Sequence, residues 1–335
     1  MAPSLASYTG KPVVVTGADG FIGSHLTEAL VKAGAKVRAL CIYNSLGSRG
    51  WLDGLPAEVA DQIEFVLGDV RDARFVDSLC EGRAIVFHLA ALIAIPYSYK
   101  APESFIDTNV KGTMNVLEAV RRHGCERLVS TSTSEVYGTP ATLPIRETHP
   151  LQGQSPYSAS KIAADKMCEA YHCSFEVPVV TLRPFNTYGP RQSARAVLPT
   201  MLEQLIRGRK EITLGALAPK RDLTFVSDTV DGFLRAGLTK GIEGDTIQLG
   251  TGRSVSIGDL FEIAKRVTGS DATVKQAEER LRPNKSEVMV LESDPAYAKE
   301  RLDWTPQISL EEGISRTVDW MRREIDRYRA GAHPL

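Results

Sequence analysis

The feature that most constrains the fold is the stretch of residues 12–23, PVVVTGADGFIG, in which a short apolar run leads into closely spaced glycines. A β-branched run bounded by glycine is typical of a buried parallel strand. Helical spacing of apolar residues follows over 21–33, and Gly34 stands where a helix would stop. The stretch therefore predicts a strand, a glycine-rich loop and a helix in succession, as at the first strand of an α/β sheet.

The same alternation of apolar runs and helical patterns continues along the first half of the chain. Further buried strands are predicted over residues 37–42, 63–67, 85–89, 128–132 and 179–182. Amphipathic helices are predicted over 104–123 and 157–174. Strands that alternate with helices in this way indicate an α/β fold of the Rossmann type, with a doubly wound parallel sheet.

The second half of the chain has a looser pattern, which prolines interrupt at several points. We therefore expect a dinucleotide-binding domain over residues 1–180, with a return segment near 222–250. A smaller C-terminal substrate-binding lobe is expected over 181–221 and 251–330. Ligands of such folds bind at the carboxyl ends of the strands, which this lobe would cover.

The composition is that of an ordinary soluble protein. The 335 residues carry a net charge of −1 at pH 7, which gives no bias toward nucleic acid or an anionic membrane. No apolar run approaches the length of a membrane span, and the N-terminus lacks a secretory pattern. Five scattered cysteines and six scattered histidines predict reduced thiols, a cytoplasmic location and no metal site.

The glycine-rich loop has the spacing G-x-x-G-x-x-G. Gly17 allows the tight turn, Gly20 lets the backbone approach a pyrophosphate, and Gly23 permits close packing of helix on strand. Phe21 and Ile22 begin the helix, whose N-terminus presents free N–H groups to the phosphates. In this strand–loop–helix context the loop predicts dinucleotide binding.

The choice between NAD and NADP depends on the end of the second strand. An acid there would normally hold the ribose 2′-hydroxyl, but residues 38–44, RALCIYN, contain no carboxylate. Four residues could contact a 2′-phosphate: Arg38, Asn44, Ser48 and Arg49. We therefore expect NADP or NAD with a slight preference for NADP. After the third strand, Asp69 and Val70 are placed to meet the adenine, although a plain turn aspartate is the alternative.

A second cluster of polar residues follows the strand predicted over 128–132. The stretch LVSTSTSEVYG places five hydroxyl residues and Glu135 at the strand's end, where desolvation is costly unless a ligand uses them. Tyr157 and Lys161 lie four residues apart, on one face of the next helix. A nearby ammonium favours the phenolate, which can take a proton from a sugar hydroxyl. Thr133 is expected to hydrogen-bond the same hydroxyl.

These motifs together identify a resemblance. TGADGFIG, GDVRD, FHLAA, NVKGT, STSEVYG, YSASK and RPFNTYGPRQ resemble the extended short-chain dehydrogenase/reductase family of nucleotide-sugar epimerases and dehydratases. The resemblance covers nearly the whole chain. It implies a tightly held nicotinamide cofactor, a nucleoside-diphosphate sugar substrate and a homodimer. It also implies cofactor contacts from Leu89, Ala90, Ala91, Asn109 and Pro184, besides Tyr157 and Lys161.

Within that family, Glu135 favours elimination over epimerisation. A 4,6-dehydratase must remove the C5 proton after oxidation at C4, and a carboxylate is a suitable base. Ser134 precedes Glu135, as in the Thr-Ser-Glu pattern of GDP-mannose 4,6-dehydratases, so Glu135 is expected to relay the proton to the departing C6 hydroxyl. YNSLGSRGWLD and LRPNKSEV further resemble legionaminic-acid-pathway dehydratases, which act on nucleotide-linked N-acetylglucosamine.

The resemblance also implies a substrate side. Asn186 matches the residue that binds the sugar pyrophosphate, and Arg191 follows it. Arg221 and Arg282 match the arginines that bind the diphosphate, for which guanidinium forks are well suited. Tyr97, with Tyr99, would flank the sugar or pack against other aromatic rings.

Three other functions stay open on the sequence. A C4 epimerase acting on a UDP-sugar is the main alternative, and a 5,6-dehydratase that does not return hydride to C6 is another. A dinucleotide-sensing protein without turnover is a third, although such proteins typically lose the tyrosine or the lysine. The sequence leaves the nucleoside and the sugar open.

Overall fold

A seven-stranded, fully parallel sheet forms the centre of the larger lobe, with five strands from residues 12–131 and two from later in the chain, within residues 179–249. The computed structural model describes residues 5–277 and 283–328. The strand order is β3-β2-β1-β4-β5-β6-β10. The strands are β1 (Pro12–Thr16), β2 (Lys36–Ile42), β3 (Ile63–Gly68), β4 (Ile85–His88), β5 (Arg127–Thr131), β6 (Val179–Pro184) and β10 (Thr246–Leu249). The predicted Rossmann-type fold is confirmed.

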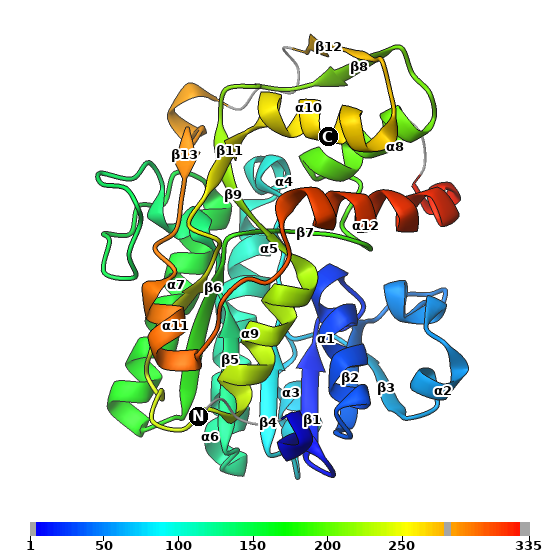
Figure 1. Ribbon diagram of the computed structural model, residues 1–335. Helices are drawn as coiled ribbons and strands as arrows, with labels where there is room; N and C mark the ends of the chain where they lie inside the picture. Colours follow the sequence, from blue (N-terminus) through cyan, green and yellow to red (C-terminus); the bar gives the residue numbers. More distant parts are fainter. Residues whose placement is uncertain (1–4, 278–282, 329–335) are drawn as a thin grey trace.

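Helices cover both faces of this sheet (Figure 1). Alternation along β1 sends Val13 and Val15 into one core and Val14 into the other. The first core contains α1 (Phe21–Lys32) and α9 (Val226–Leu238), with the short α2 (Ala57–Ala60) beside α1. The second core contains α3 (Ala73–Cys80), α6 (Gly112–His123) and α7 (Pro156–Phe175). Strands buried on both faces explain the near-continuous apolar runs in the sequence.

The helix predicted over 104–123 is interrupted in the structure. A short helix α5 (Pro102–Phe105) passes through a π-helical turn over Ile106–Lys111 before α6 begins. The turn shifts the helical register, and Ile106 at its start is 51% exposed. Such π turns often occur at functional sites.

The second half of the chain builds a smaller lobe above the carboxyl ends of the sheet strands (Figure 1). A second sheet contains β9 (Lys220–Phe225), β11 (Ser254–Ser256) and β13 (Val290–Leu291), and β7 (Asn186–Tyr188) also pairs with β9. A two-stranded sheet joins β8 (Glu211–Leu214) to β12 (Thr273–Gln276). The lobe's helices are α8 (Val197–Ile206), α10 (Ile257–Thr268) and α12 (Leu310–Arg323). Two further helices are α4 (Ile95–Lys100), which packs against α5 and α7, and α11 (Ala296–Leu302), which packs against β10 and α9.

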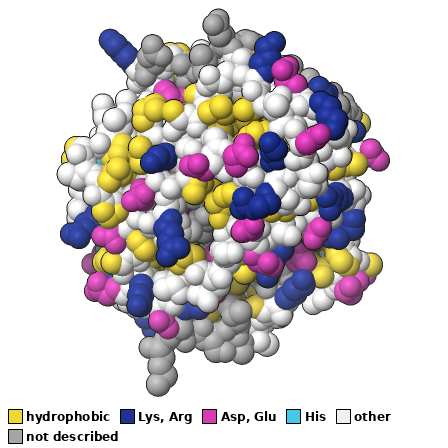
Figure 2. Space-filling view, turned by 45° about the horizontal axis from the view of Figure 1, so that its top comes forward, with side chains coloured by type: hydrophobic (Ala, Val, Ile, Leu, Met, Phe, Trp, Pro, Cys, Tyr) yellow, Lys and Arg dark blue, Asp and Glu magenta, His cyan; other side chains and the backbone are white. Residues whose placement is uncertain are grey.

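Figure 2 shows lysine and arginine side chains interspersed with aspartate and glutamate over the face that it presents, without a broad area of one sign. Among the described helices, none combines the length and the apolar character that a membrane crossing requires. All five cysteines are free thiols, and four of them are buried.

Candidate functional site

The loop between β1 and α1 leaves no room for side chains at two of its glycines. A Cβ on Gly17 would lie 2.7 Å from the backbone nitrogen of Ala90, and one on Gly23 would overlap the carbonyl oxygen of Gly17. Gly20 is exposed, and a Cβ there would meet only the Gly17 oxygen, at 3.3 Å. The loop is therefore closed toward the sheet and open at Gly20. This cradle fits a dinucleotide pyrophosphate at the α1 N-terminus, where the first N–H groups have no intrahelical partner.

His88, which the sequence analysis did not single out, is buried at the end of β4. It connects the glycine-rich loop to the segment that follows β4. The Thr16 hydroxyl oxygen accepts from the N–H groups of Leu89 and Ala90, both at 3.1 Å. Its own proton therefore goes to Nδ1 of His88, 2.8 Å away. His88 must then carry its proton on Nε2, which donates to the Thr113 hydroxyl at 3.1 Å. Burial, helped by the Lys161 charge, lowers the pKa of His88 to about 3, so the ring is neutral.

The chain of hydrogen bonds continues through the π turn to the helix that carries Tyr157. Thr113 donates to the carbonyl oxygen of Asn109 at 2.6 Å. The Asn109 amide is fully buried: it bonds the N–H and carbonyl of Leu92 and donates to the Ser160 hydroxyl at 2.9 Å. Ser160 in turn donates to the carbonyl of Tyr157. The side chain of Asn109 therefore positions the loop after β4 against α7, and its amide is already fully engaged.

At the end of β2, the residues expected to receive a 2′-phosphate are engaged with other parts of the protein. Arg38 donates to Glu64 at 2.8 Å and to carbonyls of α3. The Asn44 amide bonds only backbone groups of its own loop. Ser48 and Arg49 both donate to Asp53. These side chains are bonded within the protein, so they give no support to the slight preference for NADP that was expected.

The adenine-side prediction has a mixed outcome. The Asp69 carboxylate accepts from the backbone of Arg71 and pairs with its guanidinium at 2.6 Å, which holds the pKa of Asp69 below its usual range. Val70 is buried, and its side chain lies against Gly112. The turn-aspartate alternative therefore describes Asp69 as the structure has it, and an adenine contact stays a prediction.

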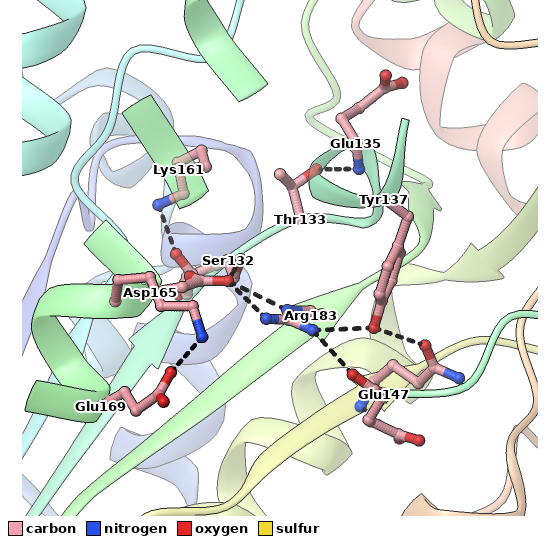
Figure 3. Close-up of polar contacts among 12 residues, drawn as sticks. Ser132, Thr133, Glu135, Tyr137, Glu147, Lys161, Asp165, Glu169 and Arg183 are labelled. Atoms are coloured by element: carbon pink, nitrogen blue, oxygen red, sulfur yellow. Dashed lines mark hydrogen bonds and ion pairs between the residues drawn. The ribbon is translucent and has the colours of Figure 1, made fainter. Parts of the chain in front are cut away.

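The segment predicted to be catalytic begins where β5 ends. Thr133 caps a short 3₁₀ turn, Ser134–Tyr137, by accepting from the Glu135 N–H at 3.3 Å. Ser134 is buried, whereas the Glu135 side chain points away from Thr133 (Figure 3). The Glu135 carboxylate makes no hydrogen bond or ion pair to any residue in the described parts of the chain. A carboxylate without a partner is available to a ligand.

Tyr157 lies beside this segment, in the first turn of α7. The turn is fixed by Ser155, whose hydroxyl accepts from the Ser158 N–H at 3.1 Å. Burial raises the pKa of Tyr157; a hydrogen bond with Thr133 opposes this shift, and the negative charge of Glu135 adds to it. The structure therefore brings together Thr133, Tyr157 and Glu135, as the sequence predicted.

Lys161 and a buried ion pair, Asp165–Arg183, lie beside this segment (Figure 3). Lys161 donates to the carbonyl of Thr131 at 2.6 Å, and burial lowers its pKa while Asp165 opposes that shift. Asp165 accepts from the Ser132 hydroxyl at 2.7 Å and from Nη2 of Arg183 at 3.0 Å. Both partners of the ion pair are only 6% exposed. Sequence reasoning missed Asp165 and Arg183; the carboxylate one turn after Lys161 was the available signal.

Aromatic side chains form a wall next to Tyr157. The rings of Phe105 and Tyr157 are 6.2 Å apart, and those of Tyr97 and Phe105 are 6.0 Å apart. Tyr97 therefore packs against Phe105, next to Tyr157, and is half-buried. The hydroxyl of Tyr99 lies 2.5 Å from that of Ser286, which comes from the second lobe. The two lobes meet here, at the edge of the site.

The substrate-side residues have three different positions. Asn186 begins β7, and its Oδ1 is buried with no hydrogen-bond partner among the described residues. Arg221 is buried on β9 and pairs with Glu287 at 3.1 Å. Arg191 instead lies against α1: its guanidinium pairs with Glu28 at 2.8 Å. Arg282 lies outside the described residues.

Pro184 ends β6, next to β5 in the sheet, and Ala91 follows the Leu89–Ala90 step that contacts the glycine loop. Both lie at the carboxyl edge of the sheet, where they were expected. Within the described ranges, no three histidine, cysteine or acidic side chains gather in a way that could hold a metal ion.

The chain is similar to known proteins along most of its length. Residues 14–317 match the family described as GDP-mannose 4,6 dehydratase. The chain is 35% identical to UDP-glucose 4-epimerase of Mycolicibacterium smegmatis over 317 residues, which cover 93% of this chain and 98% of the relative. It is 33% identical to dTDP-glucose 4,6-dehydratase of Streptomyces antibioticus over 314 residues, 92% of each chain.

Solved structures of the same kind superpose closely. An epimerase from Methanothermobacter thermautotrophicus has a TM-score of 0.88 at 31% identity and covers 98% of this chain and 96% of its own. A dTDP-glucose 4,6-dehydratase from Streptomyces venezuelae, solved with NAD bound, has a TM-score of 0.85 at 29% identity and covers 95% and 99%. The glycine cradle, the tyrosine–lysine helix and these matches together show that the chain belongs to the GDP-mannose 4,6-dehydratase family, within the extended short-chain dehydrogenases/reductases that act as NAD(P)-dependent nucleotide-sugar dehydratases and epimerases.

Proposed function

We propose that this protein is a nucleotide-sugar 4,6-dehydratase. It converts a nucleoside-diphosphate hexose, with nucleotide-linked N-acetylglucosamine as the proposed substrate, into the 4-keto-6-deoxy sugar. The sugar assignment depends on the resemblance of YNSLGSRGWLD and LRPNKSEV to legionaminic-acid-pathway dehydratases. The reaction takes place without net consumption of the cofactor.

The observation that carries this proposal is the position of Glu135. Its negative charge helps to raise the pKa of Tyr157, and Thr133, two residues before Glu135, hydrogen-bonds the Tyr157 phenol. It is half-buried and makes no hydrogen bond or ion pair within the described chain. An epimerase has no use for a second base at this point, whereas an elimination needs one to remove the C5 proton.

The proposed mechanism gives each residue one task. Thr133 hydrogen-bonds the C4 hydroxyl, and Tyr157 takes its proton while the Lys161 ammonium stabilises the phenolate. When the nicotinamide dinucleotide is bound, it supplies hydride acceptance at C4 and hydride return at C6. Glu135 takes the C5 proton, which the adjacent C4 carbonyl makes acidic, and delivers it to the C6 hydroxyl, which leaves as water. As hydride returns to C6, C5 takes up a proton from solvent through Glu135, and Tyr157 releases to solvent the proton that it took from the C4 hydroxyl. Arg221 and the amide nitrogen of Asn186 are proposed to donate to the sugar diphosphate, and the unpaired Oδ1 of Asn186 to accept from a sugar hydroxyl.

The decisive experiment compares Glu135→Gln with the native protein on a panel of nucleotide sugars. The native protein should release one water per sugar and incorporate solvent deuterium at C5, as measured by mass spectrometry. Glu135→Gln keeps the shape of the side chain but loses its proton affinity. Water loss should therefore fall about a hundredfold or more, the usual scale for a missing general acid or base.

Tyr157→Phe is the matched control, because it blocks the earlier step and should abolish both products and deuterium exchange. If Glu135→Gln dehydrates at the native rate, the proposed role of Glu135 is wrong. If the native protein returns only a C4 epimer, it is a UDP-sugar epimerase, as in the relative from M. smegmatis. A product that has lost water without gaining hydride at C6 would instead identify a 5,6-dehydratase. If the protein binds the dinucleotide but forms no product, it is a dinucleotide-sensing protein without turnover.

We also propose a cytoplasmic homodimer that forms through the outer faces of α6 and α7. Met114 on α6 and Phe175 on α7 are exposed by 37% and 53%, and such side chains are common in interfaces. Sedimentation equilibrium should give twice the chain mass at micromolar concentration, and a monomer would contradict the proposal.

A further inference from the structure

A carboxylate occupies the end of β2, although the strand itself supplies none. Asp19 belongs to the glycine-rich loop after β1, and its Oδ2 accepts from the N–H of Ile42, the last residue of β2, at 3.1 Å. The carbonyl of Asp19 accepts from the Trp51 N–H at 3.1 Å, which folds the following loop back onto the same place. Asp19 thus lies where an acid from the second strand would normally lie.

No cation neutralises this carboxylate within residues 5–277 and 283–328. Arg49 is the nearest candidate by sequence, but its Nε pairs with Asp53 at 2.9 Å and its guanidinium lies 4.2 Å above the Phe65 ring. Arg38 is paired with Glu64 on β3. Burial raises the pKa of Asp19, and the bond from Ile42 opposes this shift. The Asp19 carboxylate therefore bonds backbone N–H groups, those of Ile42 and of its own residue, and no side chain among the described residues.

The chemistry of the two dinucleotides differs at this position. The adenosine ribose of a dinucleotide lies at the end of the second strand, where a carboxylate accepts a hydrogen bond from the 2′-hydroxyl of NAD. NADP carries a phosphate there, which a carboxylate repels unless a guanidinium or ammonium is free to meet it. Asp53 and Arg49 neutralise each other in this loop, so the Asp19 carboxylate is the charge there that lacks a counter-ion among the described residues.

We propose that Asp19, from the glycine-rich loop, binds the ribose 2′-hydroxyl and makes the protein select NAD over NADP. The inference rests on the dinucleotide chemistry of the proposed function, and it replaces the slight preference for NADP that the strand end alone suggested. The acid that selects the cofactor therefore comes from the loop after β1 instead of from β2, and the Ile42 N–H holds it in place.

The test measures binding and needs no sugar. The dissociation constants of NAD and NADP are measured by calorimetry on nucleotide-free protein at fixed salt. NAD should bind at least about tenfold more tightly, a difference of about 1.4 kcal/mol. Asp19→Asn keeps an acceptor for the Ile42 N–H but removes the charge, so the NAD:NADP affinity ratio should fall about tenfold. Asp61→Asn makes the same charge change just before β3, at the amino ends of the strands, and should leave the ratio unchanged.

A second measurement needs no variant. Salt screens a repulsion between partly exposed charges, so the ratio for the native protein should fall as salt is raised from 0.05 to 0.5 M, on the order of severalfold. Equal or tighter binding of NADP by the native protein would overturn the proposal, since Arg49 would then leave Asp53 for the phosphate. An unchanged ratio in Asp19→Asn would overturn it as well. Neither result depends on whether the protein dehydrates a sugar.

Discussion

The cofactor side and the sugar side of the site differ in how completely their polar groups are paired. On the cofactor side, the Thr16 hydroxyl uses all its hydrogen-bonding capacity, and His88, Thr113 and Asn109 continue the chain to α7. On the sugar side, the Asn186 oxygen and the Glu135 carboxylate have no partner in the described chain. The cradle is thus complete before its ligand arrives, whereas the sugar surface has groups that only a ligand can satisfy.

The largest effect expected from this comparison is at Gly23. In Gly23→Ala the new methyl group overlaps the Gly17 carbonyl, so α1 and the loop must separate. We expect a loss of at least about 1–3 kcal/mol in the free energy of unfolding and loss of co-purified nucleotide. Chemical denaturation and absorbance of the purified protein measure both.

Gly208→Ala is the control for backbone conformation alone. Gly208 has φ +74° and no atom within 4 Å of the added Cβ. It should cost about 1 kcal/mol and leave the bound nucleotide in place. If Gly23→Ala keeps its nucleotide and native stability, the cradle is not closed as described.

A smaller, pH-dependent effect is expected at His88. Its pKa lies at about 3 in the folded protein, whereas an unfolded histidine titrates near 6.5. Below pH 6.5 the unfolded chain therefore takes up a proton that the folded chain refuses, so stability present above pH 6.5 is lost as the pH falls toward 3. Each pH unit in this window costs about 1.4 kcal/mol.

His88→Gln removes this proton uptake. Between pH 7.5 and 5, its free energy of unfolding should fall by about 2 kcal/mol less than that of the native protein. The difference at pH 7.5 separately measures the lost hydrogen bonds. Parallel stability curves for the two proteins would mean that His88 is not held neutral.

The smallest effect is expected at Arg191. Its size shows whether Arg191 acts on the cofactor side or on the sugar side of the site. Its ion pair with Glu28 is half-buried, with side chains 15% and 18% exposed. Arg191→Met should therefore reduce the free energy of unfolding by about 1 kcal/mol and leave the KM for the nucleotide sugar within about twofold. Glu28→Gln, which breaks the same pair and also the exposed pair between Glu28 and Lys32, should cost at least as much. A KM raised tenfold or more in Arg191→Met alone would return Arg191 to the sugar side.

The sequence predicted those parts of the molecule that depend on neighbouring residues. The strand–loop–helix at 12–23 and the Tyr157–Lys161 pair are local patterns, and both are found as expected. The Asp165–Arg183 pair was not predictable, because it joins residues 18 apart whose meeting depends on how α7 packs on β6. The π turn at Ile106–Lys111 was missed since Asn109 is drawn inward by Leu92 and Ser160, a tertiary contact that overrides helical spacing.

The cofactor end shows the same limit. The absence of an acid in residues 38–44 was correctly noted, but a sequence does not show that Asp19, 23 residues away from Ile42, reaches that strand end. Likewise, four polar residues were expected to contact a 2′-phosphate. The sequence does not show that partners such as Glu64 and Asp53 engage these residues in the folded protein.

The return of the chain from the upper lobe to the main sheet has a consequence for how the protein is made. Helix α1 packs against α9, and β10 pairs with β6, so the first helix of the chain is covered by residues that follow it by about 200 positions. During synthesis, the apolar side of α1 therefore waits uncovered until more than two thirds of the chain has left the ribosome. Contacts this distant along the chain slow folding and lengthen the exposure of apolar surface. A chain cut after residue 225 contains the entire glycine-rich loop and still lacks the helix that would shield it.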